Sequence, residues 1–355
     1  MQALFPEGAF FCHALRSLAW TRVAADAPRD GALFRSALDA ARRGLDSMES
    51  QLDAFPSTEG LSPTHGVFFA GWINWTRGAI LSLGVRDSAG TEMETAFRRD
   101  CDSIAAAFSS AGTPYLESYP EMSWPSDNVV CIAALRMHDF LYGAKFVPVI
   151  SEWLLKAKQR LDPVTGMIPY QSHPFDGIPM EGAHGNSQAV ILVFLAEIDP
   201  VFASEQYRLY ARTFPAHPLG LWLAREYPKQ KRGLGNIDSG PVLFGVGSAA
   251  TMVAMAPMRV FGDAQAADAV RSSIDALGLP FTMAGKRRYA LGMLPVADAF
   301  LSWAETVAPY TGRIAAAPSL FPHKAWRLPF LALSAVIVSL VWAPLLLGRR
   351  RARKP

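Results

Sequence analysis

Six turn-rich segments recur along the chain, and each one leads into a strongly apolar run. Successive segments start roughly 60 residues apart, which is the length of two helices with their connections. Because one helix pair cannot bury its apolar face alone, six such units predict that neighbouring pairs pack together around one core. The segments are FPEG from Phe5, LSPTHG from Leu61, YPEMSWPSDN from Tyr119, IPMEGAHGNS from Ile178, GLGNIDSGP from Gly233 and LGMLPVAD from Leu291.

Two kinds of predicted helix alternate after these turns. The first kind is apolar around most of its circumference and is expected to be buried on several sides; it covers residues 10–20, 67–83, 129–143, 187–198, 241–258 and 299–307. The second kind carries charge on one face and covers residues 33–50, 93–108, 150–161, 202–214 and 266–277. The alternation of β-branched residues that is typical of strands is not seen.

An inner ring of buried helices inside an outer ring of amphipathic helices predicts an all-α fold, an (α/α)6 toroid of six helical hairpins. All turns that enter inner helices then lie on one face, so we expect their polar side chains to converge on a central funnel. The toroid domain is predicted over residues 1–315. Six inner runs are matched by only five outer ones, which predicts a further helix, with an export signal, upstream of Met1.

The C-terminal part of the chain has a different pattern. Leu328 to Leu347 reads LPFLALSAVIVSLVWAPLLL, which carries no charge and has about the 20 residues that a transmembrane helix needs. Residues 316–327 are interpreted as a linker and residues 348–355 as a basic tail. The dense basic cluster after the span predicts that the tail is cytoplasmic and that the toroid is extracytoplasmic.

Charge excludes one class of partner. Five of the basic residues that give the net charge of +3 lie in the last seven positions, so the rest of the chain is nearly neutral to slightly acidic. Nothing therefore points to nucleic acid.

The three cysteines, Cys12, Cys101 and Cys131, lack CxxC spacing and are interpreted as buried apolar residues. With no Walker, HExxH or GxSxG motif, no metal and no cofactor is expected.

The funnel-side turns supply carboxylates and histidines beside apolar helix ends. Desolvation there raises the pKa of a carboxyl toward neutrality, which suits general acid and base catalysis. Helix capping and packing are the alternative interpretation of each residue. Asp127, which opens the third inner helix, is expected at the funnel floor, and His65 is expected to be mostly neutral. The catalytic candidates are His65, Glu121, Asp127, Glu181 and Asp238, and the substrate-binding candidates are Glu7, Trp124, Tyr170, His173 and His184.

Two stretches resemble the linalool dehydratase/isomerase family, whose fold is an (α/α)6 toroid. The first runs from Asp162 to Phe214 and has the DP-x-x-G opening, the SHP turn and the helix start at DPVFAS; the second is THGVFFAG, where His65 falls on the family's active-site histidine. Weaker similarity continues to Ala304. The family's two active-site cysteines fall near Glu117 or Ser118 and near Ser126, and neither position is Cys. The resemblance therefore implies the fold and the pocket location, but not the family's terpene alcohol chemistry, because its protonation and water-shuttling steps rely on those thiols. From their position alone, Asp127 and Glu121 are candidates to take over the acid/base work there.

Three functions remain open from the sequence. The first is an acid/base lyase or isomerase that adds or eliminates water on a small hydroxylated substrate, as the resemblance implies. The second is a glycoside hydrolase, in which Asp127 and either Asp238 or Glu181 form an inverting pair ~6.5–9.5 Å apart. The third is a membrane-anchored, non-catalytic binding module. The expected partners are a small molecule or glycan and the membrane, and the pattern is compatible with an oligomer.

Overall fold

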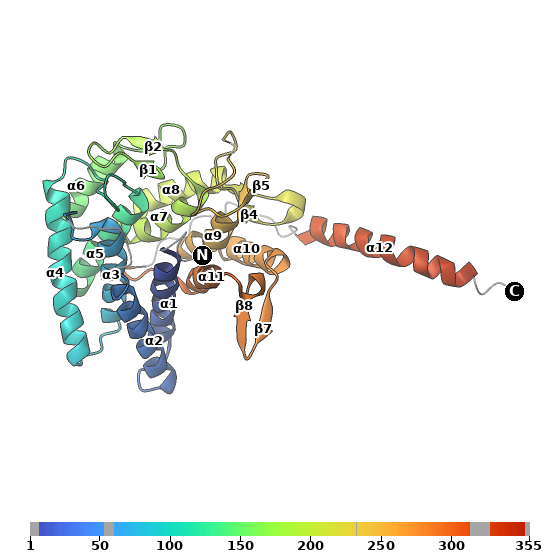
Figure 1. Ribbon diagram of the computed structural model, residues 1–355, viewed down its shortest axis with the longest axis horizontal. Helices are drawn as coiled ribbons and strands as arrows, with labels where there is room; N and C mark the ends of the chain where they lie inside the picture. The colour runs from blue at the N-terminus through green and yellow to red at the C-terminus, as the bar shows by residue number, and fades with distance from the viewer. Residues whose placement is uncertain (1–6, 53–59, 232, 313–326, 352–355) are drawn as a thin grey trace.

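The computed structural model of this chain describes residues 7–52, 60–231, 233–312 and 327–351. The described part is mostly helical, so the expectation of an all-α chain is confirmed (Figure 1). Its α-helices are α1 (Glu7–Asp26), α2 (Ala32–Glu49), α3 (Gly66–Leu81), α4 (Ser88–Ser110), α5 (Pro125–Tyr142), α6 (Val147–Lys158), α7 (Gly185–Ile198), α8 (Pro200–Thr213), α9 (Ser248–Val260), α10 (Ala264–Leu277), α11 (Pro295–Thr306) and α12 (Arg327–Arg351).

The odd-numbered helices from α1 to α11 form a closed series of contacts. Helix α1 packs on α3, α3 on α5, α5 on α7, α7 on α9, α9 on α11, and α11 on α1. The even-numbered helices from α2 to α10 each pack on the odd-numbered helix before them. This division follows the sequence pattern, because the apolar runs become the buried helices and the amphipathic runs cover them. In α7, for example, Gly185–Gln188 and Ile191–Ile198 are all buried.

Short strands occupy the links between helix pairs, where the sequence predicted none. They form four antiparallel hairpins: β1 (Gln171–Ser172) with β2 (Pro179–Glu181), β3 (Pro215–Ala216) with β4 (Leu223–Ala224), β5 (Val242–Leu243) with β6 (Val246–Gly247), and β7 (Phe281–Met283) with β8 (Lys286–Arg288). Strands of two or three residues are too short to show an alternating pattern. Two 3₁₀ turns, η2 (Pro218–Gly220) and η3 (Ala290–Gly292), lie in the same links.

One predicted helix boundary is wrong. The fifth apolar run was expected to be helical from residue 241, but β5 and β6 take up its first residues and α9 begins at Ser248. Gly245 has a φ of +81°, which places it in the left-handed region at the turn of this hairpin. Left-handed backbone cannot continue a right-handed helix, so the helix starts only after it.

The end of the structure where the inner helices finish is closed by the residues after α11. The backbone N–H groups of Tyr310 and Thr311 donate to the Glu197 carboxylate at the end of α7, with N···O distances of 2.7 and 2.9 Å. The Arg22 guanidinium of α1 lies 5.0 Å from the centroid of the Tyr310 ring. Tyr310 and Thr311 therefore belong to the packed body, whereas the predicted domain end at residue 315 lies outside the described residues.

The C-terminal apolar segment is helical, as expected, but its limits differ. Helix α12 continues through Arg351, so part of the predicted basic tail is helical. It contacts η2 and otherwise projects away from the body (Figure 1). Within the described ranges, no helix has both the length and the apolar character required to cross a membrane. The predicted linker lies outside the described residues, apart from Arg327.

Candidate active site

Asp127 is a buried carboxylate in the first turn of α5. Trp124 precedes this helix as its N-cap residue and Pro125 opens it, which suits a position where the backbone N–H has no helical partner. The Asp127 side chain does not cap the helix; its Oδ2 accepts a hydrogen bond from the Ser118 hydroxyl at 2.7 Å. Because Ser118 and Asp127 are both buried, this contact lies away from bulk water.

Burial raises the pKa of Asp127 to about 7, although the Ser118 hydrogen bond favours the charged form and partly opposes this effect. The negative charges of Asp238 and Glu7 raise the pKa further. Asp238 lies in the link before α9 and Glu7 is the first residue of α1, so two carboxylates far from Asp127 in the sequence lie within electrostatic reach of it. A carboxyl with a pKa near neutrality is suited to donate and accept protons.

Aromatic side chains pack together in the segment that precedes this carboxyl. The Tyr119 ring lies 5.7 Å from Phe68 and 5.9 Å from Trp124, measured between ring centroids. The Tyr119 hydroxyl donates to Glu7 Oε1 at 3.2 Å. Burial and the nearby Glu7 charge raise the pKa of Tyr119, so the phenol stays protonated. Through these contacts with Tyr119, Glu7 and Trp124 lie near the start of α5.

A second group of polar side chains centres on Tyr170. Its hydroxyl donates to Asp238 Oδ2 at 2.6 Å and accepts from Asn236 Nδ2 at 3.0 Å. Burial, followed by the Asp238 charge, raises the pKa of Tyr170. The link from β4 to β5 thereby brings Asp238 against the link that precedes α7. Two of the predicted residues, Tyr170 and Asp238, are in direct contact.

His184 joins this group to two further carboxylates. Its ring stacks on Tyr170 with centroids 4.1 Å apart. Nε2 lies 3.0 Å from Glu181 Oε1, and Nδ1 lies 3.4 Å from Glu226 Oε1. Partial burial raises the pKa of Glu181, because it disfavours the charged carboxylate. Lys231, at 3.0 Å, and His184 outweigh this effect and hold the pKa of Glu181 below its usual value. His184 itself is completely buried.

Glu226 was not identified from the sequence. It is fully buried, neither carboxylate oxygen has an aligned hydrogen-bond partner within the described ranges, and burial raises its pKa against the opposing effect of His184. Ser118 and Asn236 were also missed. The available signal for Glu226 was an acidic residue within the apolar stretch LWLAREY, but no predicted helix start marked that stretch as part of the site.

His65 lies at the entrance to α3 with a φ of +68°. It is half-buried, and the backbone N–H of Val67 donates to the Glu117 carbonyl at 3.0 Å. The next residue must be small, because a Cβ at Gly66 would lie 2.5 Å from the Ser118 carbonyl oxygen. The start of α3 is thus packed against the segment whose Ser118 contacts Asp127.

Two predicted residues lie outside this cluster. Glu121 is exposed at the tip of the turn from Tyr119 to Met122, and its backbone N–H donates to the Glu117 carboxylate at 2.7 Å. His173 is about half exposed and faces Asp176 across 3.1 Å. The structure therefore places neither side chain beside Asp127.

Comparison with known proteins gives no assignment: a scan against protein-family models finds no match, and a search of curated proteins finds no significant relative. In the part of the chain that the structure describes, no group of three or more His, Cys, Asp or Glu side chains is arranged to bind a metal ion. The three cysteines are unpaired thiols.

Proposed function

We propose that this chain is an acid/base enzyme built on an (α/α)6 toroid of the linalool dehydratase/isomerase type, acting on a small hydroxylated substrate. The observation that carries the proposal is the buried Asp127 carboxyl, whose pKa is raised to about 7 beside Ser118. The closed series of contacts among the six inner helices supports the toroid. The links that enter these helices and the first turns of α1 and α5 supply the polar side chains of the cluster.

In an elimination, protonated Asp127 gives its proton to the substrate hydroxyl, the C–O bond breaks and water leaves. A base then removes a proton from the neighbouring carbon, and its electron pair forms the double bond. Asp238, which accepts the Tyr170 hydrogen bond, is the proposed base. The faces of Tyr119 and Trp124 stabilise positive charge that develops on carbon. Addition of water, or isomerisation, uses the same two groups in the reverse order.

Hydrolysis of a glycoside is the second candidate, and it is favoured because the Asp238 carboxylate is close enough to raise the pKa of Asp127. One carboxyl with a raised pKa and a second that stays available as a base are the groups that inverting hydrolysis requires. Trp124 would then supply a platform for a sugar ring. The two candidates differ in the bond that breaks, so their products distinguish them.

Incubation of the full chain with a panel of allylic and tertiary alcohols, and separately with a panel of glycans, tests the proposal. We expect dehydration or isomerisation products from the alcohols, detected by gas chromatography with mass spectrometry. Asp127→Asn is expected to lower turnover roughly a hundred- to ten-thousand-fold. Glu121→Gln, an exposed carboxylate from the same link, is the matched control and is expected to keep its activity. Full activity of Asp127→Asn would remove the basis of the proposal.

Membrane attachment through Leu328–Leu347, with the toroid on the extracytoplasmic side, stays a prediction that rests on the sequence. Fractionation of cells that express the full chain, followed by an alkaline wash of the membranes, is the test. We expect the chain to remain in the washed membrane fraction, whereas recovery in the supernatant would contradict the attachment.

A further inference from the structure

Large apolar side chains project into solvent from the links that lead into α9 and α11. We define the apolar tips as Leu219, Leu234, Phe244, Met283 and Leu291. All five are exposed; Phe244 is 101% exposed and Leu234 is 92% exposed. Single exposed apolar side chains are common on protein surfaces, but five large ones at the turns of two links are candidates for an interaction surface.

The backbone at these turns makes the apolar residues more unusual. Phe244 and Gly245 form the two-residue turn between β5 and β6, with φ values of +53° and +81°. Asn, Asp or Gly normally takes the first of these positions, because left-handed backbone is unfavourable for a bulky side chain. Leu219 and Leu291 have φ values of +53° and +56° and also precede glycines. Folding stability alone gives no reason to hold bulky apolar groups there.

The charge around the tips is predominantly basic. Residues 278–294 contain Lys286, Arg287 and Arg288 and no acidic residue. Arg287 pairs with Asp275 at 2.8 Å and Arg288 with Asp298 at 3.2 Å, so part of this charge is already compensated. Lys286 is exposed at the turn of the β7–β8 hairpin, three residues after Met283.

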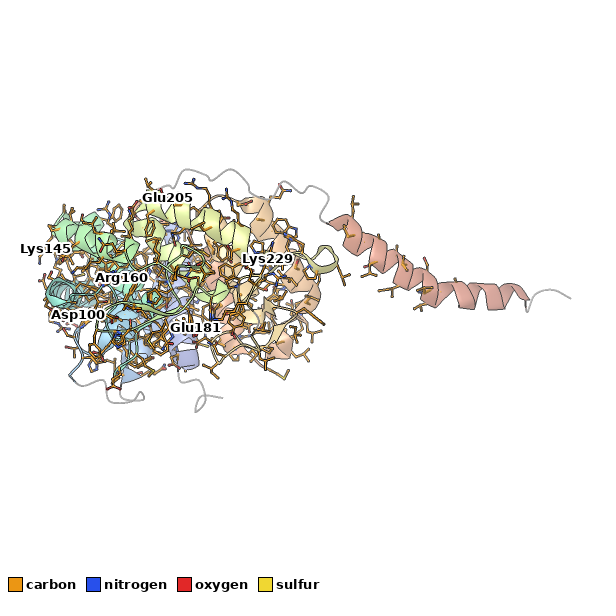
Figure 2. The ribbon with its side chains drawn as sticks, turned by 90° about the horizontal axis from the view of Figure 1, so that it is seen from above. Asp100, Lys145, Arg160, Glu181, Glu205 and Lys229 are labelled. Atoms are coloured by element: carbon orange, nitrogen blue, oxygen red, sulfur yellow. The ribbon has the colours of Figure 1, made fainter. Side chains whose placement is uncertain are left out.

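The link before α9 has the same combination. Lys229 and Lys231 precede Leu234 along the chain, and Lys231 pairs with Glu181 at 3.0 Å. Lys229 is exposed and lies on the part of the body nearer to α12, whereas Asp100 and Lys145 lie at the far end (Figure 2). The apolar helix α12 contacts η2, which carries Leu219.

We propose that the apolar tips, with Lys229 and Lys286, bind the surface of an anionic lipid bilayer. Apolar groups that enter the headgroup region, next to lysines that attract anionic lipids, are the chemistry of interfacial membrane binding. A second protein copy is less favoured, because the centres of protein interfaces are depleted in lysine. The link with Leu234 and Phe244 also carries Asp238 of the candidate active site. This inference goes beyond the catalytic proposal and does not depend on it.

Fluorescent labels at single positions of the full chain test the inference. They report contact with lipid at each position, even if α12 attaches the chain to vesicles by itself. In a Cys12→Ser background, Phe244→Cys and Met283→Cys each receive an environment-sensitive label, while Cys101 and Cys131 are buried. Val201→Cys, an exposed apolar position on the outer helix α8, is the matched control. The probes are vesicles of phosphatidylcholine alone and of phosphatidylcholine with phosphatidylglycerol, each with and without brominated lipid.

We expect the labels at 244 and 283 to shift to shorter wavelength and to be quenched by brominated lipid on the anionic vesicles. The label at 201 is expected to keep the emission wavelength that it has in water. Lys229→Glu with Lys286→Glu should weaken the binding that produces the response at 244 and 283 by at least about thirtyfold. The inference would be overturned if the labels at 244 and 283 keep the emission wavelength that they have in water, or if the label at 201 is quenched equally. A shift that appears without vesicles and grows with protein concentration would instead assign the tips to a second copy of the chain.

Discussion

The Ser118 hydroxyl donates a 2.7 Å hydrogen bond to Asp127 Oδ2 and also accepts one from the backbone N–H of Trp124 at 3.2 Å. One buried hydroxyl therefore links the segment before α5 to the carboxyl in its first turn. The bond to Asp127 stabilises the charged carboxylate, whereas burial stabilises the neutral acid. The balance between these two effects sets the pH at which Asp127 loses its proton.

Ser118→Ala removes the contact that favours the charged form. The pKa of Asp127 should then rise above about 7. If protonated Asp127 is the acid, activity is present below its pKa and is lost as the pH rises through it, so the alkaline limb of the pH–rate profile should move to higher pH. A lower rate with an unmoved limb would mean that Ser118 has only a structural role. Ser126→Ala, in the neighbouring position before the carboxyl, is the control.

Glu226→Gln tests the buried carboxyl beside His184. Because the pKa of Glu226 is raised in the folded state, the native chain binds this proton more tightly than the unfolded chain. Stability from this group is therefore present at acid pH and is lost as the pH rises through the folded pKa. We expect the melting temperature of Glu226→Gln to fall less than that of the wild type between acid and neutral pH. If the melting temperatures of Glu226→Gln and of the wild type change with pH in parallel, the pKa of Glu226 is not raised in the folded chain. The control variant Glu121→Gln should follow the wild type.

Truncation tests where the packed body ends. A chain that stops after Val307 loses Tyr310 and Thr311, which donate to the buried Glu197 carboxylate. Leaving that carboxylate without partners should lower the free energy of unfolding by about 3–5 kcal/mol. A chain that stops after residue 315 keeps both donors and should melt cooperatively at higher temperature. Equal stability of the two truncations would show that these contacts contribute little.

His65→Asn tests the histidine at the entrance to α3. Asn tolerates the left-handed backbone that residue 65 adopts better than most residues do. The variant therefore removes the imidazole while keeping the local fold. We expect a near-native melting temperature with a large loss of turnover. A native rate would reduce His65 to a structural residue.

The order of the helices could be predicted because it depends on patterns that repeat many times. Each inner helix, such as α7, is apolar on nearly all sides, and each outer helix has one charged face. The turns were also informative, since they singled out Asp127 together with Glu7 and Asp238, whose negative charges raise the pKa of Asp127. These predictions needed only the alternation of buried and exposed helices.

The paths of the links could not be predicted, and the remaining differences arise there. Glu121 and Asp127 are six residues apart, yet one lies at an exposed turn tip and the other is buried. Glu226 enters the site because the β4–β5 link folds over α7, where the Glu226 carbonyl accepts from the Gly185 N–H at 2.8 Å. Such long-range contacts leave no local periodicity in the sequence. The short β5–β6 hairpin similarly replaced the first residues of a predicted helix.

The protonation of Asp127 is the most direct measure of the central claim. An infrared difference spectrum between the wild type and Asp127→Asn isolates the C=O stretch of this one carboxyl, which can be followed as the pH is changed. We predict a protonated band at weakly acid pH that disappears with a midpoint near pH 7. A midpoint near the ordinary aspartate value of about 4 would show that Asp127 is charged at neutral pH and does not act as the acid.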